Sequence, residues 1–362
     1  MTINLRLFFQ SLLQLLILFS LNEQFYSSDL PTGYYNLILT FAYLAFSFIF
    51  VVFDKRYLRF TDFLIPATTF CYVLYMGGGG YHARVYALTT LLFFLASVLS
   101  FENCKLLFGG TIWMGLFYSV RQYLDGIPRV TGFFNTSPTI FSMVLLIALC
   151  YFNFSPLVTK GERVFYSVLS LGQIYLTSSR STFFLALMLI FWVSIIQPLL
   201  QTKRLNTPAK AILFITITLL SSFLVFLLIT SFQLREDAFQ SSEARQQIFE
   251  YFFRAIIENP KEYIFGKGAG YTLFETARLL PWIKTETYPL HQDILMWLVE
   301  YGFVGFVVLY FVLFFKKTIH WVIYLLFLVG SFHNLFIAPI LVLLLTILNN
   351  QLVRERKPNV SN

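Results

Sequence analysis

Two ionisable residues stand out in the segment ETYPLHQDILMWLVEYGFVG, which joins a polar stretch to an apolar helical pattern at residues 286–305. His291 lies where the two meet. Its side chain titrates near neutral pH, so it can take a proton from a hydroxyl group as a general base. We predict this role for His291, with the capping of a helix end as the plainer alternative. His82 and His333 are rivals, because both also lie at ends of apolar segments.

Glu300 follows nine residues later, at a depth of about 13 Å if the apolar segment is one helix. A carboxylate at such a depth usually faces the protein interior and has a partner. We therefore predict a structural role for Glu300, in a pair with a polar group. Gly302 and Gly305 lack side chains and would let a neighbouring helix approach closely.

Arginines offer a second kind of chemistry. Arg84, Arg121, Arg129 and Arg180 lie in or beside short connections between apolar segments, and no lysine accompanies them. A guanidinium binds phosphate oxygens through two parallel hydrogen bonds and keeps its charge. These arginines are therefore candidates to bind an anionic phosphate ligand. The alternative is that each one extends from a helix end toward water.

Arg245 is a further candidate, on a predicted helix that Ser241 or Ser242 would cap and that Asn259-Pro260 would end. At ~100° per residue, Arg245 lies in the middle of the apolar face and Arg254 lies opposite, in solvent. The apolar face consists of Ile248, Phe249, Phe252 and Ile256. An arginine among such residues needs an acidic partner or a ligand.

A glycine-rich segment, Gly266–Gly270 (GKGAG), follows this helix. Its glycines allow a tight turn, and successive backbone N–H groups could form an anion-binding nest. It has neither the strand–loop–helix context of a dinucleotide site nor the lysine–serine/threonine pair of a phosphate-binding loop. We therefore exclude nucleotide binding.

The elements that position these residues are expected to be membrane helices. The chain is 57% hydrophobic and only 12% charged, with a mean hydropathy of +0.71, which is too apolar for one soluble core. We predict an all-α, polytopic membrane protein with about 12 transmembrane helices, each near the ~20 residues that a crossing needs. They are expected at 5–21 (a retained span rather than a signal peptide), 34–53, 60–76, 83–101, 104–120, 136–153, 163–178, 181–200, 209–231, 292–315, 318–333 and 335–350.

The distribution of Lys and Arg sets the predicted topology. They gather on alternate connections, which places both termini in the cytoplasm and the long segment 232–289 outside. We divide the chain into a transmembrane bundle of nine spans (1–231), a large extracytoplasmic loop with short helices (232–289), and C-terminal spans with a short cytoplasmic tail (290–362). This topology explains the net charge of +8 without a nucleic-acid partner.

Five motifs, in this order, resemble those of the O-antigen ligase / O-antigen polymerase family over roughly residues 120–310. They are Arg129-Val-Thr-Gly-Phe-Phe-Asn135-Thr-Ser-Pro138, Ser179-Arg180, the helix from Arg245 to Pro260, Gly266–Gly270, and His291 followed by Glu300, Gly302 and Gly305. The chain has His291-Gln292 where the family often has His-Asn, a change that retains an amide.

The resemblance implies a glycosyltransferase of the bacterial inner membrane whose donor is a glycan carried on undecaprenyl pyrophosphate. A polymerase would use it to extend lipid-linked repeat units of O-antigen or capsule, and an O-antigen ligase would transfer it to the lipid A core. His291 would activate or orient the acceptor hydroxyl. Arg180 and Arg245 would hold the pyrophosphate, with Arg129 and Arg121 behind them.

The expected cofactors and partners, and a third alternative, complete this interpretation. The outer connections hold no acidic pair at metal-ligand spacing, so we expect arginines rather than a metal to stabilise the leaving group, and we expect no cofactor. Membrane lipid, the glycan acceptor and a chain-length regulator protein are the expected partners, and nucleic acid is not. A polysaccharide flippase or other transporter is the third alternative, but it predicts charges deep within several spans and usually internal repeats.

Overall fold

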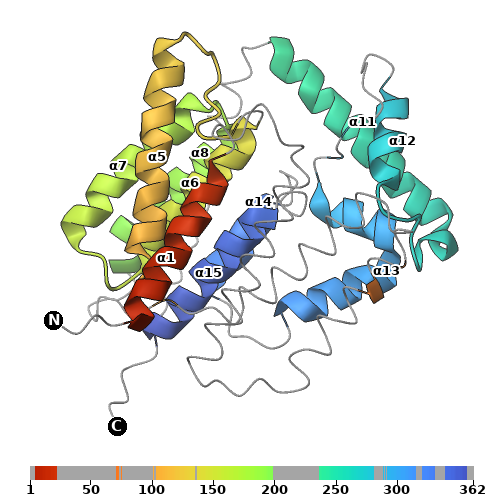
Figure 1. Ribbon diagram of the computed structural model, residues 1–362. Helices are drawn as coiled ribbons and strands as arrows, with labels where there is room; N and C mark the ends of the chain where they lie inside the picture. Colours follow the sequence, from red (N-terminus) through yellow and green to blue (C-terminus); the bar gives the residue numbers. More distant parts are fainter. Residues whose placement is uncertain are drawn as a thin grey trace, which may run out of the picture. The chain divides into compact units, whose positions relative to one another are not determined.

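The computed structural model describes residues 5–22, 71–72, 75, 101, 103–134, 137–198, 236–280, 288, 290, 292–314, 320–330 and 339–356. All regular secondary structure in these ranges is helical (Figure 1), which confirms the all-α prediction. The chain divides into two compact units. Unit 1 comprises residues 1–110, 133–135 and 244–362, and unit 2 comprises residues 111–132 and 136–243. The predicted boundaries at 231/232 and 289/290 stay predictions.

Unit 2 is built around a helix that is buried on nearly every side. This helix, α6 (Pro138–Phe154), has a continuous buried stretch at residues 141–153. Around it the unit contains most of α5 (Lys105–Leu124), α7 (Lys160–Leu176), α8 (Arg180–Phe191) and the short π-helix η2 (Trp192–Ile196). A helix that is apolar all round, as α6 is, can only be stable at the centre of such a group or in lipid.

Local signals in the sequence start two of these helices. The Ser137 hydroxyl accepts a hydrogen bond from the backbone N–H of Ile140, and Pro138 occupies the first turn of α6, where its missing N–H costs nothing. Thr159 and Glu162 form a reciprocal capping box at the start of α7. Helix α6 begins two residues after the predicted start at 136, and α7 begins three residues before the predicted start at 163.

Unit 1 joins the N-terminal helix to the C-terminal part of the chain. It contains α1 (Leu5–Leu21), most of α11 (Glu236–Glu258), the 3₁₀ turn η4 (Pro260–Tyr263), α12 (Tyr271–Leu279), α13 (Asp293–Phe314), α14 (Trp321–Gly330) and α15 (Pro339–Arg356). The Gln14 amide links α1 to the start of α5, because it donates to the Asn103 carbonyl at 2.8 Å and accepts from the Leu107 N–H at 3.0 Å.

One apolar cluster ties α11 and α12 to α13. Its buried members are Ala244, Ile248, Phe252, Tyr263, Leu280, Leu290, Leu295, Met296, Trp297, Val299, Tyr301 and Val342. Most of these residues come from α11 and the first half of α13. The segment predicted as a large loop therefore carries its own helices and packs them on the helix that follows it.

Helix α13 differs from the uninterrupted span predicted at 292–315. Gly302 has φ 70° and ψ −176°, which breaks the helix after Tyr301. Only glycine adopts this backbone conformation at little cost. The helix therefore consists of two halves, and Glu300 lies at the end of the first.

Described helices occupy eight of the twelve predicted spans: 5–21, 104–120, 136–153, 163–178, 181–200, 292–315, 318–333 and 335–350. The other four, 34–53, 60–76, 83–101 and 209–231, lie almost wholly outside the described residues. Within the residues that are described, no helix combines the length and apolarity needed to cross a membrane.

Candidate functional site

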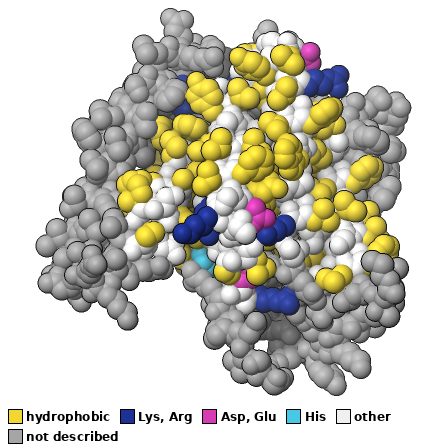
Figure 2. All heavy atoms as spheres, turned by 90° about the vertical axis from the view of Figure 1, so that its left-hand side faces the viewer, with side chains coloured by type: hydrophobic (Ala, Val, Ile, Leu, Met, Phe, Trp, Pro, Cys, Tyr) yellow, Lys and Arg dark blue, Asp and Glu magenta, His cyan; other side chains and the backbone are white. Residues whose placement is uncertain are grey.

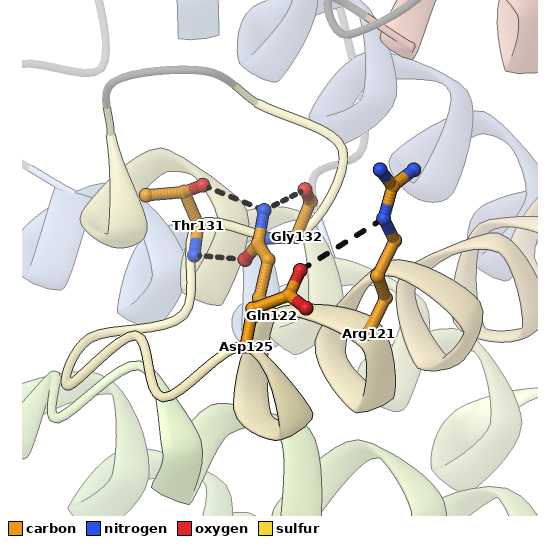
Figure 3. Close-up of polar contacts among 5 residues, drawn as sticks. All are labelled: Arg121, Gln122, Asp125, Thr131 and Gly132. Carbon is orange, nitrogen blue, oxygen red and sulfur yellow. Dashed lines mark hydrogen bonds and ion pairs between the residues drawn. The ribbon is translucent and has the colours of Figure 1, made fainter.

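The loop that carries Arg129 is held in place by Gln122, a buried residue in the last turn of α5 (Figure 3). The Gln122 amide oxygen accepts hydrogen bonds from the N–H groups of Thr131 and Gly132 at 2.8 and 3.0 Å. Its amide nitrogen donates to the Thr131 hydroxyl at 3.1 Å and to the Gly132 carbonyl at 2.9 Å. Both ends of one side-chain amide are thus bound to two consecutive residues of the loop.

The same loop is attached on its other side to the end of α7. Val130 donates its N–H to the Leu176 carbonyl at 3.2 Å, and the Arg129 Nε donates to the Thr177 carbonyl at 3.4 Å. The Arg129 side chain is exposed, yet these contacts fix it at the turn between α7 and α8. This turn leads directly to Arg180.

The α7–α8 turn places Arg180 at the first residue of α8. Ser178 has φ 56° and is the one non-glycine residue with a positive φ among the described residues. The Ser179 hydroxyl does not cap the helix but lies 2.9 Å from the Thr182 hydroxyl, to which Ser142 of α6 donates at 3.1 Å. Arg180 therefore combines its own charge with the positive end of the α8 dipole.

Arg121 precedes Gln122 in the last turn of α5. Its Nε lies 3.9 Å from a carboxylate oxygen of Asp125, and both side chains are more than half exposed. Such an ion pair contributes little to stability and leaves the guanidinium able to bind another anion. Three of the five predicted site residues therefore belong to unit 2: Arg129 lies in the loop that Gln122 holds, Arg121 in the last turn of α5 before it, and Arg180 after the turn that Arg129 contacts.

The other two predicted site residues, Arg245 and His291, belong to unit 1. His291, its rivals His82 and His333, and the side chain of Arg245 lie outside the described residues. The backbone of Arg245 is part of α11. The predicted roles of all five site residues stay predictions.

The surroundings of Arg245 agree with the prediction in part. Ile248 and Phe252 are buried and Arg254 is exposed, as expected, but Phe249 is 39% exposed. The predicted start at Ser241 or Ser242 is wrong, since α11 begins at Glu236. Residues 236–240 already belong to the helix, so neither serine marks its start.

Glu300 has the structural role predicted for it. Its side chain is fully buried and accepts hydrogen bonds from the Thr272 N–H at 3.2 Å and from the Thr272 hydroxyl. Helix α12 begins after Gly270, which has no side chain to cap it. The Glu300 carboxylate supplies that cap from another helix, where a negative charge is also favoured by the helix dipole.

The glycine-rich segment pairs with the break in α13 rather than forming an anion nest. The N–H groups of Lys267 and Gly268 donate to the carbonyls of Val299 and Glu300, both at 2.9 Å. A Cβ on Gly302 would lie 2.4 Å from the Gly266 nitrogen, so the two backbones touch. The predicted close approach at Gly302 is thus made by this segment and not by a helix.

Charged and phenolic groups on α11 and α12 are engaged with one another. The Tyr251 hydroxyl donates to Glu275 at 2.9 Å, and burial together with this carboxylate raises the pKa of Tyr251 to about 12. Lys267 forms an ion pair with Glu262, which raises the pKa of Lys267, and its ammonium lies 5.4 Å from the centre of the Tyr263 ring. The Lys267 side chain is therefore bound by Glu262 and Tyr263, which lie a few residues before it.

Comparison with known proteins gives a match to a family model. The O-antigen ligase family model matches residues 165–310, from α7 to the second half of α13, so the resemblance seen in the sequence is confirmed. The match includes Arg180, Arg245 and His291, whereas Arg121 and Arg129 precede it. Members are membrane-associated glycosyltransferase-type enzymes of bacteria, polymerases or ligases. No curated protein matches the chain.

Proposed function

With the O-antigen ligase match as premise, we propose that the chain is a polymerase of undecaprenyl-pyrophosphate-linked repeat units in the synthesis of O-antigen or capsule. It acts in the bacterial inner membrane through twelve spans, with both termini in the cytoplasm and residues 232–289 outside. The glycan of one lipid-linked donor is transferred to a sugar hydroxyl of a second lipid-linked unit.

The reaction exchanges one bond at the anomeric carbon of the donor. The acceptor oxygen forms a bond to this carbon while the bond to the pyrophosphate oxygen breaks. His291 takes the proton of the acceptor hydroxyl. The departing pyrophosphate gains negative charge, which Arg180 and Arg245 stabilise without a metal ion, with Arg129 and Arg121 behind them.

The observation that carries this proposal is that Arg129 is held at the turn that leads to Arg180, while Arg121 lies next to Gln122 in the last turn of α5. Gln122 holds the loop on one side, the Thr177 carbonyl binds Arg129 on the other, and α8 begins at Arg180 three residues later. Guanidinium groups at the start of a helix are suited to a diphosphate. A neutral ligand would not need them.

The test is the length of surface polysaccharide made by variants in a host that lacks the gene. Arg180→Ala, Arg245→Ala and His291→Ala are each expected to reduce long chains roughly hundredfold, because each loses charge or proton-transfer stabilisation of the transition state. Arg254→Ala is the matched control on the exposed face of α11 and is expected to give normal chains. Normal chains from all three site variants, at normal protein levels, would refute the assignment.

An O-antigen ligase is the second candidate, since the matched family model carries that description. Resolving the polysaccharide by length on a gel also distinguishes a polymerase from a ligase. Loss of a polymerase leaves single repeat units on the cell surface, whereas loss of a ligase leaves long chains on the carrier lipid. A flippase predicts a third result, in which repeat units accumulate on the cytoplasmic side.

A further inference from the structure

An apolar groove runs along the outer side of α5. It is a shallow, open groove of about 550 Å³, lined by Trp113, Leu116, Phe117, Val120, Arg121, Leu124 and Asp125. These residues recur at intervals of three and four, so they form a single stripe along the helix. We call this stripe the α5 groove.

Large apolar side chains in the α5 groove are about half exposed or more. Trp113 is 49%, Phe117 66% and Leu124 78% exposed. The opposite side of α5 is closed, because a Cβ on Gly115 would lie 2.5 Å from the Gln173 amide oxygen and 3.0 Å from the Phe141 ring. Figure 2 shows the face at the left of Figure 1, where α5 and α7 lie, and hydrophobic side chains cover much of its described part. Contiguous apolar surface of this kind normally meets lipid, a ligand or a partner.

The α5 groove ends at the arginine loop. Arg121 lines its last turn, and the next residue, Gln122, holds the loop that carries Arg129. The carboxylate of Asp125 is also there, but it lies beside Arg121 in an ion pair. From Trp113 to Leu124 the groove extends about 16 Å at 1.5 Å per residue. Its shape and charge fit an amphiphile with a long apolar chain and an anionic head.

We propose that the α5 groove binds the polyisoprenyl tail of the lipid-linked donor, with the first isoprene units beside Val120 and Leu124. This inference rests on the proposed function. A pyrophosphate at Arg121, Arg129 and Arg180 leaves its attached tail at the arginine end of the groove, and the groove is the apolar surface that begins there. The tail thereby holds the donor in the orientation that presents its glycan to the acceptor.

The first test identifies the lipid in contact with the groove. A photoreactive benzophenone amino acid replaces Phe117 in the full-length chain, and the matched control carries it at Val168, which is 64% exposed on α7. After irradiation of intact cells, the adduct masses are measured. A polyisoprenyl adduct is expected at position 117 and phospholipid adducts alone at position 168. Phospholipid alone at both positions overturns the proposal.

The second test varies the length of the tail in a transfer assay with purified full-length protein. Trp113→Ser and Phe117→Ser, in the part of the groove far from Arg121, are expected to raise the KM for an undecaprenyl-linked donor about fivefold through lost apolar contact. The KM for a donor with a single isoprene unit, which cannot extend along the groove, is expected to stay unchanged. An equal rise for both donors, or no rise for either, overturns the groove assignment.

The two proposals fail in different ways. If Arg180→Ala, Arg245→Ala and His291→Ala all form normal polymer, the proposed function is refuted, whatever lipid the groove binds. If Arg180→Ala loses polymer but position 117 captures only phospholipid, the function stands and the groove assignment alone is wrong.

Discussion

At the scale of single residues, the position of the arginine loop depends on an uncharged side chain. Gln122 uses its amide oxygen on two N–H groups and its amide nitrogen on a hydroxyl and a carbonyl, all from Thr131 and Gly132. Sequence reasoning selected the charged neighbours Arg121 and Arg129 and missed Gln122. The available signal was an amide that follows an arginine at the end of an apolar helix, just before a glycine-containing loop.

The first prediction concerns Gln122→Glu. The carboxylate keeps the shape and the acceptor but faces the Gly132 carbonyl without a proton to donate, so the loop with Arg129 loosens. We expect the KM for the lipid-linked donor to rise about tenfold with kcat changed little, which corresponds to ~1.4 kcal/mol for a lost buried hydrogen bond. Lys160→Gln, an exposed change at the start of α7, is the control. A variant with unchanged KM would show that the loop does not depend on this amide.

The second prediction concerns the cap that Glu300 provides for α12. Glu300→Ala leaves the N–H and hydroxyl of Thr272 buried without this acceptor, so we expect a loss of about 1–3 kcal/mol of stability. Glu300→Gln retains an acceptor and is expected to lose less. The measurement is the thermal midpoint of the detergent-solubilised protein, with exposed Glu258→Ala as control. Equal midpoints for Glu300→Ala and the control would contradict the capping role.

At the scale of elements, α13 is two half-helices joined at Gly302. The break frees the carbonyls of Val299 and Glu300, and the glycine-rich segment fills the opening with the N–H groups of Lys267 and Gly268. The Val304 N–H also donates to the Ile264 carbonyl at 3.1 Å. These backbone partners allow a break to exist inside an apolar element. The pairing attaches the loop region to the helix that follows His291.

The third prediction is that Gly302→Ala disrupts this attachment. An added Cβ would lie 2.4 Å from the Gly266 nitrogen and from the Ile264 carbonyl oxygen, at a φ of 70° that alanine rarely adopts. We expect a loss of roughly 1–3 kcal/mol or more, seen as faster proteolysis between α11 and α12. Gly161→Ala in α7 is the matched control, since its Cβ would meet nothing within 4 Å. Proteolysis of Gly302→Ala at the control rate would mean that the contact is dispensable.

The elements themselves were largely predictable, and their contacts were not. Apolar segments of the sequence predicted the positions of eight described helices, because hydrophobicity and helical periodicity depend on residues that are close together along the chain. Gly302 and Gly305 were correctly linked to a close approach, but a glycine does not say whether a helix or an extended segment comes near. The partner of Glu300 lies 28 residues away, at a distance along the chain that no local pattern encodes.

At the scale of the whole molecule, the proposed reaction requires a defined topology. The donor pyrophosphate and the acceptor must meet on the outer side, so the arginine loop and residues 232–289 must both be extracytoplasmic. The α6–α7 connection at residues 155–159 must then be cytoplasmic, because α6 separates it from the arginine loop. This assignment came from the distribution of Lys and Arg, which reports sidedness but no side-chain geometry.

The last prediction tests that sidedness with single cysteines. Cys71 is exposed and is first replaced by Ser, whereas Cys104 and Cys150 are buried and inaccessible to a reagent in water. Glu258→Cys, at the exposed end of α11, is expected to react with a membrane-impermeant maleimide in intact protoplasts. Gly161→Cys, beside the α6–α7 connection, is expected to react only after the membrane is opened. The reverse pattern would place the arginines on the cytoplasmic side, away from any donor that has crossed the membrane, and would contradict the proposed function together with the topology.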